Sequence, residues 1–234
     1  IRDDVESRGL GDVYKRQVIE YGSRYDYVVC SGGDGTMNEV ANGMMRLHEK
    51  PICGYIPAGT VNDFASSLRI PKVMRHAAEL VTQGKVFRCD LGSFNDKFFT
   101  YVAGFGAFTE VSYTTPQEWK NMLGKTAYFI EGLKHLAEIK PHHMRITYDE
   151  GVVEDDFVLG LVSNSVSVAG YKAYKKEDIK MDDGLFEVLF IRDLKNALEL
   201  QEVLNALLTK HLDATKMFRC SSRHLHIVCD DEVQ

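Results

Sequence analysis

The feature of the sequence that most constrains the fold is a glycine-rich turn between an apolar run and an amphipathic stretch. Residues 27–30 are apolar and partly β-branched, which is typical of a strand buried on both faces of a parallel sheet. Gly32, Gly33 and Gly35 follow this run. Because glycine has no Cβ and accepts positive φ, such a backbone approaches a bound group closely. The stretch predicts a strand, a tight loop and a helix, in that order.

The residues after the turn have helical spacing. Met37, Val40, Ala41 and Met44 fall on one face of a helix that we expect over residues 37–48. The free N–H groups and the positive dipole end at the start of such a helix favour phosphate. Neither of the two standard glycine patterns for nucleotides is present, so a strand-to-helix turn without a ligand is the alternative interpretation.

A second loop of the same kind follows. Residues 55–65 again contain a strand, a turn with Pro57 and Gly59, and a polar cluster that leads into a helix. In an open α/β sheet both loops lie at the carboxyl edge of the strands, where ligands bind. We therefore expect the two loops to form one site.

The two loops together resemble the diacylglycerol kinase catalytic-domain family of lipid kinases, of the bacterial type related to the sphingosine kinases. Residues 32–38, Gly-Gly-Asp-Gly-Thr-Met-Asn, look like the nucleotide-binding motif of that family. Residues 57–65 look like its Pro-x-Gly-Thr-x-Asn-Asp-Phe-Ala motif. The first motif is shared with NAD kinases, whereas the second is particular to the lipid kinases. The resemblance extends over residues 18–234.

The resemblance implies which residues bind ATP. Backbone N–H groups of residues 32–36 would hold the phosphates, and Thr60 and Asn38 would orient them. Asp34, the catalytic candidate, and Asp63 would join a network of magnesium and phosphate. The complete implied set is Gly32, Gly33, Asp34, Gly35, Thr36, Met37, Asn38, Gly59, Thr60, Asn62 and Asp63.

An acidic turn at residues 180–188 is the second implied site. By itself, Asp-Gly before an apolar run is ordinary hairpin chemistry. It also resembles the family's Asp-Asp-Gly-Leu-x-x-Val, where a structural Mg²⁺ is held by an aspartate and backbone carbonyls. The implied ligands are Asp183 and the carbonyl oxygens of Lys180 and Leu185. Oxygen ligands suit this hard cation.

The family's general base is a glutamate in an Asp-Gly-Glu motif on a late strand. Glu232, in Asp-Asp-Glu, is one candidate, and the alternative is that the motif lies beyond Gln234. The family begins upstream with a strand and an Asn-Pro-x-x-Gly loop, which residues 1–17 do not match. We therefore expect a chain truncated at both ends, nearly inactive, with residues 1–17 unassigned, disordered or foreign to the domain.

The order of expected elements predicts two domains. Strands and helices alternate up to residue 85, which predicts an α/β nucleotide-binding domain, a parallel sheet with helices, over residues 18–85 and lacking its first strand. Residues 86–234 predict an antiparallel, β-sandwich-like lipid-substrate domain with helical insertions at 116–139 and 196–212. Further elements are expected at 52–56, 73–82, 87–91, 97–102, 144–148, 157–163, 185–191 and 224–229.

Composition restricts the partners. A net charge of −6 and a pI near 5.8 argue against general nucleic-acid binding. Five scattered cysteines without a Cys-x-x-Cys pair are typical of reduced thiols in a cytoplasmic protein. No apolar run is long enough for a transmembrane segment, so a lipid substrate requires a location peripheral to the membrane. The insertion at 116–139 either faces lipid or packs on the sheet, and an oligomer is possible.

The resemblance implies an enzyme that transfers the γ-phosphate of ATP, with Mg²⁺, to the hydroxyl of diacylglycerol or a related lipid. Two alternatives remain at this point. A kinase of the NAD kinase type explains residues 32–36 but not residues 57–65. The second alternative is a fragment that binds nucleotide or lipid without catalysing a reaction. Gly104 and Gly106 belong either to the site or to a close approach of two strands.

Overall fold

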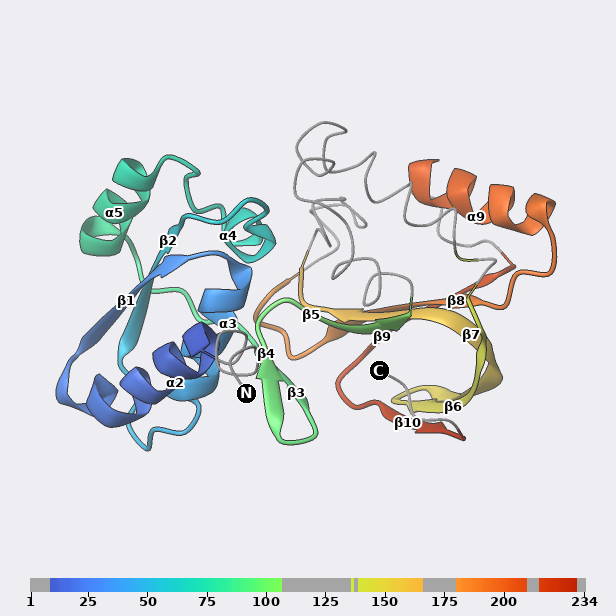
Figure 1. Ribbon diagram of the computed structural model, residues 1–234, viewed down its shortest axis with the longest axis horizontal. Coiled ribbons are helices and arrows are strands. Elements are labelled where there is room, and N and C mark those ends of the chain that lie inside the picture. Colours follow the sequence, from blue (N-terminus) through green and yellow to red (C-terminus); the bar gives the residue numbers. More distant parts are fainter. Residues whose placement is uncertain (1–8, 107–135, 137–138, 166–179, 210–214, 231–234) are drawn as a thin grey trace. The chain divides into compact units, whose positions relative to one another are not determined.

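The computed structural model describes residues 9–106, 136, 139–165, 180–209 and 215–230 (Figure 1). The chain divides into two compact units, Ile1–Tyr101 and Val102–Gln234. The first is an α/β unit and the second is built on an antiparallel sheet, as the sequence predicts. The boundary expected from the sequence falls at residue 85, whereas the units divide after Tyr101.

The first unit is built on two parallel strands. β1 (Tyr27–Gly32) pairs with β2 (Ile52–Pro57) in a register that places Gly32 opposite Pro57. α3 (Asp34–Met44) connects them, and α4 (Asp63–Ser67) and α5 (Met74–Gln83) follow β2. The carboxyl ends of both strands therefore lie together, with a helix starting shortly after each end.

α3 begins earlier and ends earlier than the predicted range of 37–48. It starts at Asp34, so the last glycine of the turn and Thr36 lie in its first turn. Met37, Val40 and Ala41 are buried, which confirms the predicted apolar face. After Met44 the backbone tightens, because the amides of residues 46 and 47 bond to carbonyls three residues back, at 3.1 and 3.0 Å.

Of the alternatives given for residues 1–17, disorder is wrong for residues 9–17, which belong to helix α2 (Gly9–Tyr21). The short 3-10 helix η1 (Gly22–Arg24) follows it. Val18 is buried beside Gly43 of α3, where an added Cβ would lie 2.8 Å from the valine side chain. This packing stabilises a helix whose sequence is too polar to indicate one.

The strand expected at 87–91 is absent from the structure. Residues 85–91 have no regular structure, and Val86 and Phe87 are 65% and 57% exposed. The first hairpin comes later, as β3 (Gly92–Phe94) and β4 (Lys97–Phe99). Of the apolar residues that favoured a strand at 87–91, Phe87 is exposed, whereas Cys89 and Leu91 are partly buried.

A left-handed residue ends α4. Arg69 has a φ of 60°, and its N–H donates to the carbonyl of Ser66 at 3.3 Å. The N–H of Ile70 donates to the carbonyl of Ala65 at 2.9 Å. This is the helix end at which glycine is the usual residue, and here it is an arginine.

The second unit contains a six-stranded antiparallel sheet in the order β10-β6-β7-β8-β9, with β5 beside the later part of β7. The sequence predicts β6, β7, β8 and β10, but it misses β9 and all of β5 except its first residue, because the strand expected at 97–102 ends as β4 at Phe99. Their bounds are β5 (Val102–Gly106), β6 (His142–Tyr148), β7 (Gly151–Ser163), β8 (Phe186–Arg192), β9 (Met217–Ser222) and β10 (His226–Cys229).

The glycines of β5 allow it to approach β7. An added Cβ on Gly104 would lie 2.7 Å from the carbonyl oxygen of Gly160, and Gly106 has a φ of +94°. A β-branched or aromatic residue does not tolerate that φ. Strand packing accounts for both glycines without a ligand.

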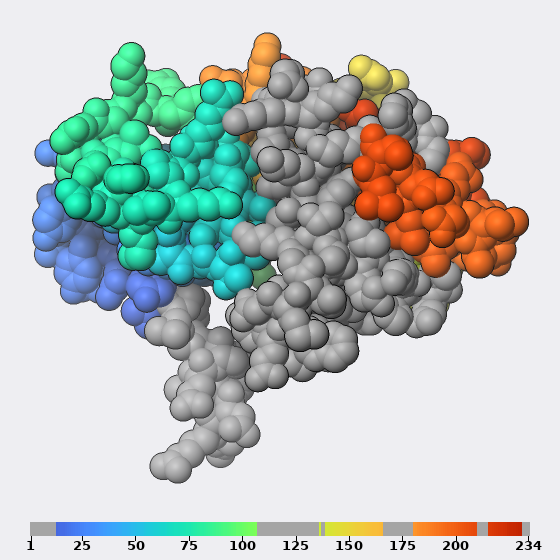
Figure 2. Space-filling model, turned by 90° about the horizontal axis from the view of Figure 1, so that it is seen from above, coloured from blue at the N-terminus to red at the C-terminus, as the bar shows by residue number. Residues whose placement is uncertain are grey.

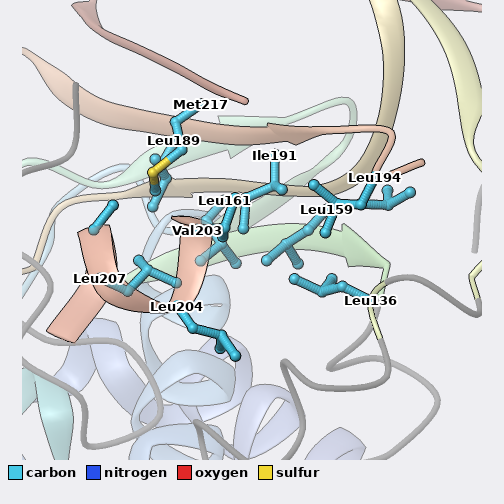
Figure 3. Close-up of a cluster of buried hydrophobic side chains, with 12 residues drawn as sticks. Leu136, Leu159, Leu161, Leu189, Ile191, Leu194, Val203, Leu204, Leu207 and Met217 are labelled. Carbon is cyan, nitrogen blue, oxygen red and sulfur yellow. The ribbon is translucent and has the colours of Figure 1, made fainter. Parts of the chain in front are cut away.

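In the described part of the second unit, helix α9 (Ala197–Thr209) packs on the sheet. It contributes Val203, Leu204 and Leu207 to the buried cluster of Figure 3. The cluster also includes Leu159, Leu161, Leu189 and Ile191 from the sheet. The predicted helix 196–212 is thus confirmed up to Thr209, and residues 210–212 lie outside the described part of the chain.

Most of the predicted insertion at 116–139 also lies outside the described residues. Leu136 is fully buried in the cluster of Figure 3, and Ile139 packs against that cluster. Among the residues that the structure describes, no helix is long and apolar enough to cross a membrane.

Replacing Leu207 with alanine tests the packing of α9. We expect Leu207→Ala to lower the free energy of unfolding by about 2 to 5 kcal/mol, because it leaves a cavity at a side chain that is 1% exposed. The neighbouring Leu208 is 55% exposed, so Leu208→Ala is the control and should cost less than about 0.5 kcal/mol. Urea titration followed by circular dichroism measures both. Equal losses for the two variants would contradict the packing of α9.

Candidate functional site: two loops at the end of a parallel strand pair

The two glycine loops lie against each other, as the sequence predicts. An added Cβ on Gly59 would lie 2.5 Å from the Cα of Gly33, so this contact needs a glycine at position 59, whereas a Cβ on Gly33 would make a tight contact of 3.3 Å with Gly59. The N–H of Ala58 also donates to the carbonyl of Gly32 at 2.8 Å, which extends the pairing of β1 and β2 by one bond. The loops that follow the two strands therefore form one surface.

Asp34 joins the two loops. One oxygen of its carboxylate accepts the N–H of Asp63 at 3.0 Å, and the other accepts the N–H of Phe64 at 3.1 Å. These amides belong to the first turn of α4 and have no acceptor within that helix. Asp34 thus caps α4 from the start of α3, across 29 residues of sequence.

The surroundings of Asp34 change its acidity. Burial raises the pKa of its carboxyl above the ordinary value, and the nearby charge of Asp63 adds to this. The backbone N–H groups of Phe64 and Asp63 act in the opposite direction. Burial also raises the pKa of the Tyr55 and Tyr101 hydroxyls, and the charge of Asp34 contributes to both. The two phenols near this carboxylate remain neutral at physiological pH.

Asn62 shapes the second loop. It has a φ of 55°, a left-handed conformation that asparagine accepts better than most residues. Its side-chain oxygen accepts the N–H of Gly59 at 3.0 Å, and its side-chain nitrogen donates to the carbonyl of Gly59 at 2.5 Å. The asparagine amide therefore closes the loop on itself and leaves Thr60 exposed at its tip.

Two asparagines of α3 hold the chain that follows the hairpin. Asn42 donates to the carbonyl of Phe98 at 2.7 Å and accepts its N–H at 3.0 Å. Asn38 accepts the N–H of Thr100 at 3.1 Å. These bonds keep residues 97–100 with the first unit, although the sequence assigns them to the second. Sequence reasoning missed Asn42, and the signal was a polar residue one turn after Asn38 on the apolar face of a helix.

Tyr55 was also missed by sequence reasoning. It is 5% exposed, its hydroxyl donates to the carbonyl of Gly32 at 3.3 Å, and its ring lies 6.2 Å from that of Phe64. A tyrosine within an apolar strand gives no signal for such a role. Tyr55 thus contacts the first loop at Gly32 and the first turn of α4 at Phe64.

The remaining residues of the predicted set differ in what they offer. Met37 is 7% exposed and its N–H donates to the carbonyl of Gly33 at 3.0 Å, so it contributes packing and helix structure. Gly35 and Thr36 lie in the first turn of α3, where the amides have no helical partner. An added Cβ on Gly35 would meet none of the described residues within 4 Å. The open part of the site is thus the first turn of α3.

A hollow of about 480 Å³ adjoins the glycine loop. Ser31 and Thr36 contribute to its lining, together with tyrosines of α2 and β1 that include Tyr14, Tyr21 and Tyr27. A second hollow, of about 430 Å³, lies in the second unit. Its charged side chains are all in ion pairs, for example Arg192 with Asp155 at 2.8 Å and Asp156 with His143 at 2.9 Å.

The predicted magnesium ligands lie in a turn before β8. One carboxylate oxygen of Asp183 accepts the N–H of Leu185 at 3.0 Å, and Gly184 has a φ of 73°. The turn therefore presents oxygen ligands of the kind that a hard cation takes. The guanidinium of Arg223 is close to it, 2.7 Å from where a Cβ on Gly184 would lie. Among the described residues, no three acidic, histidine or cysteine side chains are arranged so that they could hold a metal ion together.

Glu232 lies outside the described residues, so the structure does not place the candidate general base. The geometry brings together most of the predicted nucleotide set, from Gly32 to Asp63, in one unit. The predicted metal ligands Lys180, Asp183 and Leu185 belong to the other unit.

Comparison with known proteins gives the family. The model of the diacylglycerol kinase catalytic domain matches residues 5–94, which include both loops. A diacylglycerol kinase of Bacillus subtilis is 32% identical over 211 residues, which cover 90% of this chain and 69% of that protein. The chain belongs to the diacylglycerol kinase family.

Other members of the diacylglycerol kinase family agree with this placement. A diacylglycerol kinase of Staphylococcus saprophyticus is 35% identical over 195 residues, covering 83% of the chain and 63% of the relative. A crystal structure of a diacylglycerol kinase from Bacillus anthracis superposes with a TM-score of 0.78 at 28% identity, over 97% of this chain and 74% of that one. The chain spans about two thirds of the length of the curated relatives it matches.

Removing the carboxylate of Asp34 tests the junction of the loops. Asp34→Ala leaves the amides of Asp63 and Phe64 without their acceptor, and we expect the free energy of unfolding to fall by about 1 to 3 kcal/mol. Hydrogen exchange at these two amides should accelerate together. Asp182→Ala, at an exposed carboxylate, is the control and should change stability by less than about 0.5 kcal/mol. Unchanged exchange in the Asp34 variant would show that the carboxylate does not join the loops.

Proposed function

We propose that this chain is the ATP-binding and lipid-binding part of a kinase that transfers the γ-phosphate of ATP to the hydroxyl of diacylglycerol or a related lipid. Membership of the diacylglycerol kinase family supports the reaction class. The first unit would bind ATP, and the second would bind the lipid. Positioning and charge neutralisation supply most of the rate in phosphoryl transfer.

The observation that carries the proposal is the open first turn of α3. The protein itself explains the other glycines of the two loops: a Cβ on Gly32 would meet Thr36 at 2.6 Å, and Gly33 and Gly59 contact each other. Gly35 has no such neighbour among the described residues, and glycine is a poor helix former. A bound phosphate beside the N–H groups of this turn accounts for the missing side chain.

The other residues of the site would act on the position of that phosphate. Asp34 has both oxygens on amides of α4, so we assign it to fixing the two loops and not to binding the nucleotide directly. Asn62 gives the second loop its shape, and the exposed Thr60 at its tip would donate its hydroxyl to a phosphate oxygen. The fixed loops would thus hold the triphosphate in one orientation.

Magnesium would neutralise phosphate charge during transfer, as it does in kinases generally. In the second unit, Asp183 and the carbonyls of Lys180 and Leu185 would hold a structural Mg²⁺, because they offer a carboxylate and two backbone oxygens. Bound Mg²⁺ should then stabilise the turn in unfolding measurements, and Asp183→Asn should remove that stabilisation.

The two alternatives differ in how well they account for the site. A kinase of the NAD kinase type gives residues 57–65 no role. In the structure this loop is joined to the first loop, because Asp34 accepts the N–H of Asp63 and Gly59 contacts Gly33. A protein that binds nucleotide without catalysis would share the same loops. It differs from the proposal only in the transfer reaction, which is therefore what the assay must measure.

Replacing Gly35 with alanine separates an effect on folding from an effect on ligand binding. We expect Gly35→Ala to leave the free energy of unfolding unchanged or to raise it by about 0.5 to 1 kcal/mol, because alanine is the better helix former. ATP affinity should fall by about tenfold or more, since the Cβ occupies the space of the phosphate. Isothermal titration calorimetry with Mg²⁺ and ATP measures this. Gly151→Ala, whose Cβ would make only ordinary contacts with Tyr148, is the control.

The transfer reaction is tested with labelled ATP and mixed micelles. The proposal predicts that label from the γ-phosphate appears in the organic phase as a phosphorylated lipid when the micelles contain diacylglycerol, at the low rate expected if the Asp-Gly-Glu motif lies beyond Gln234. Micelles without it and reactions with NAD as acceptor are the controls. Label in a water-soluble product with NAD, and none in lipid, would favour the NAD kinase type.

A further inference from the structure

Residues 69–88 combine exposed apolar side chains with a local excess of cations. Four large apolar side chains in this segment are 52% to 65% exposed: Val73, Met74, Val86 and Phe87. The sequence gives no reason for the exposure of Phe87, since it belongs to the run 87–91 that is predicted as a strand. In Figure 2 the teal and green side chains of this part of the chain lie on the outer surface of the first unit.

The charge of the same segment is opposite to that of the whole chain. It carries five arginines and lysines and one carboxylate, whereas the chain has a net charge of −6. All five cations are exposed; they are Arg69, Lys72, Arg75, Lys85 and Arg88. The carboxylate of Glu79 is paired with Arg75 at 3.2 Å. The segment therefore presents a positive surface on an acidic protein.

At the end of the segment, two cations stand on either side of two apolar residues. Lys85 and Arg88 flank the exposed pair Val86 and Phe87, in a stretch without regular structure. α5 before it is fixed to the sheet, because Ala77 is buried and the side chain of Val81 lies against Gly54 of β2. A rigid helix thus presents a short apolar tip between two cations.

We propose that residues 69–88 are the surface with which the protein docks on an anionic membrane, with Val86 and Phe87 inserted among the lipids. The inference rests on the proposed function in that a lipid kinase must reach a bilayer. Apolar side chains enter the interface while flanking lysines and arginines contact anionic head groups. The charge complementarity favours a bilayer over a nucleic acid, because a nucleic acid would leave the aliphatic Val73, Met74 and Val86 without a partner.

Co-sedimentation with vesicles of phosphatidylglycerol and phosphatidylcholine tests the docking surface, with the whole 234-residue chain and no ATP. We expect binding to these vesicles, weaker binding to phosphatidylcholine alone, and a decrease with added salt. The double variant Val86→Ser with Phe87→Ser should bind about tenfold more weakly. The double variant Lys85→Glu with Arg88→Glu should also lose at least about tenfold in affinity, together with much of the salt dependence.

The chain offers matched controls for both variants. Val152 and Phe94 are 51% and 59% exposed and lie outside the segment, so Val152→Ser with Phe94→Ser makes the same chemical change elsewhere. Arg24 and Lys50 are exposed cations outside the segment, so Arg24→Glu with Lys50→Glu is the control for the charge reversal at Lys85 and Arg88. We expect both control pairs to bind vesicles within about twofold of the unchanged protein. Thermal unfolding checks that every variant is folded.

Several outcomes would overturn the proposal. Vesicle binding that is absent, or equal in the segment variants and the controls, shows that residues 69–88 do not dock on the membrane. Binding of an RNA homopolymer that depends on Lys85 and Arg88, without vesicle binding, assigns the surface to nucleic acid. A change of oligomeric state in the Val86 and Phe87 variant, with vesicle binding intact, assigns it to self-association. Docking that depends on the segment, in a protein that phosphorylates no lipid, would leave the docking surface in place and reject the proposed reaction.

Discussion

The arrangement of the first unit depends on the contact of one carboxylate with the first turn of a distant helix. Asp34 starts α3 and at the same time caps α4, so the ends of the two strands β1 and β2 are joined beyond the sheet itself. The close contact of Gly33 with Gly59 is possible only because Gly59 has no side chain. Together they fix the distance between the loops before any ligand arrives. A preformed site of this kind loses little conformational entropy on binding.

The second unit obtains its stability in a different way. Its strands are joined by antiparallel pairing, and β7 serves two neighbours on one edge, β6 with its first part and β5 with its last part. The register of β7 against β8 shifts between Phe157 and Leu159, close to the place where its neighbour changes. α9 then covers the sheet with leucine and valine side chains (Figure 3). The two units therefore rest on separate cores, one around a parallel pair and the other under a leucine-rich helix.

The sequence predicts the parts of this protein whose signal is local. The parallel strand pair, the convergence of the two loops, α5 and most of the antiparallel strands follow from glycine positions and apolar periodicity. It fails where the reason lies in distant contacts. α2 is stabilised by packing of Val18 on Gly43. The strand expected at 87–91 does not form, although its residue types favour one. The roles of Asn42 and Tyr55 depend on backbone groups far along the chain, which no motif records.

Arg69, at the end of α4, adds a surface charge but has an unfavourable backbone conformation. A left-handed φ costs a residue with a side chain roughly 1 kcal/mol relative to glycine, and Arg69 occupies such a position while its side chain is exposed. A glycine there would make the turn more favourable and would take one positive charge from the surface beside α5. Selection for a more thermostable variant would thus be expected to remove this cation first, at the expense of whatever its charge attracts.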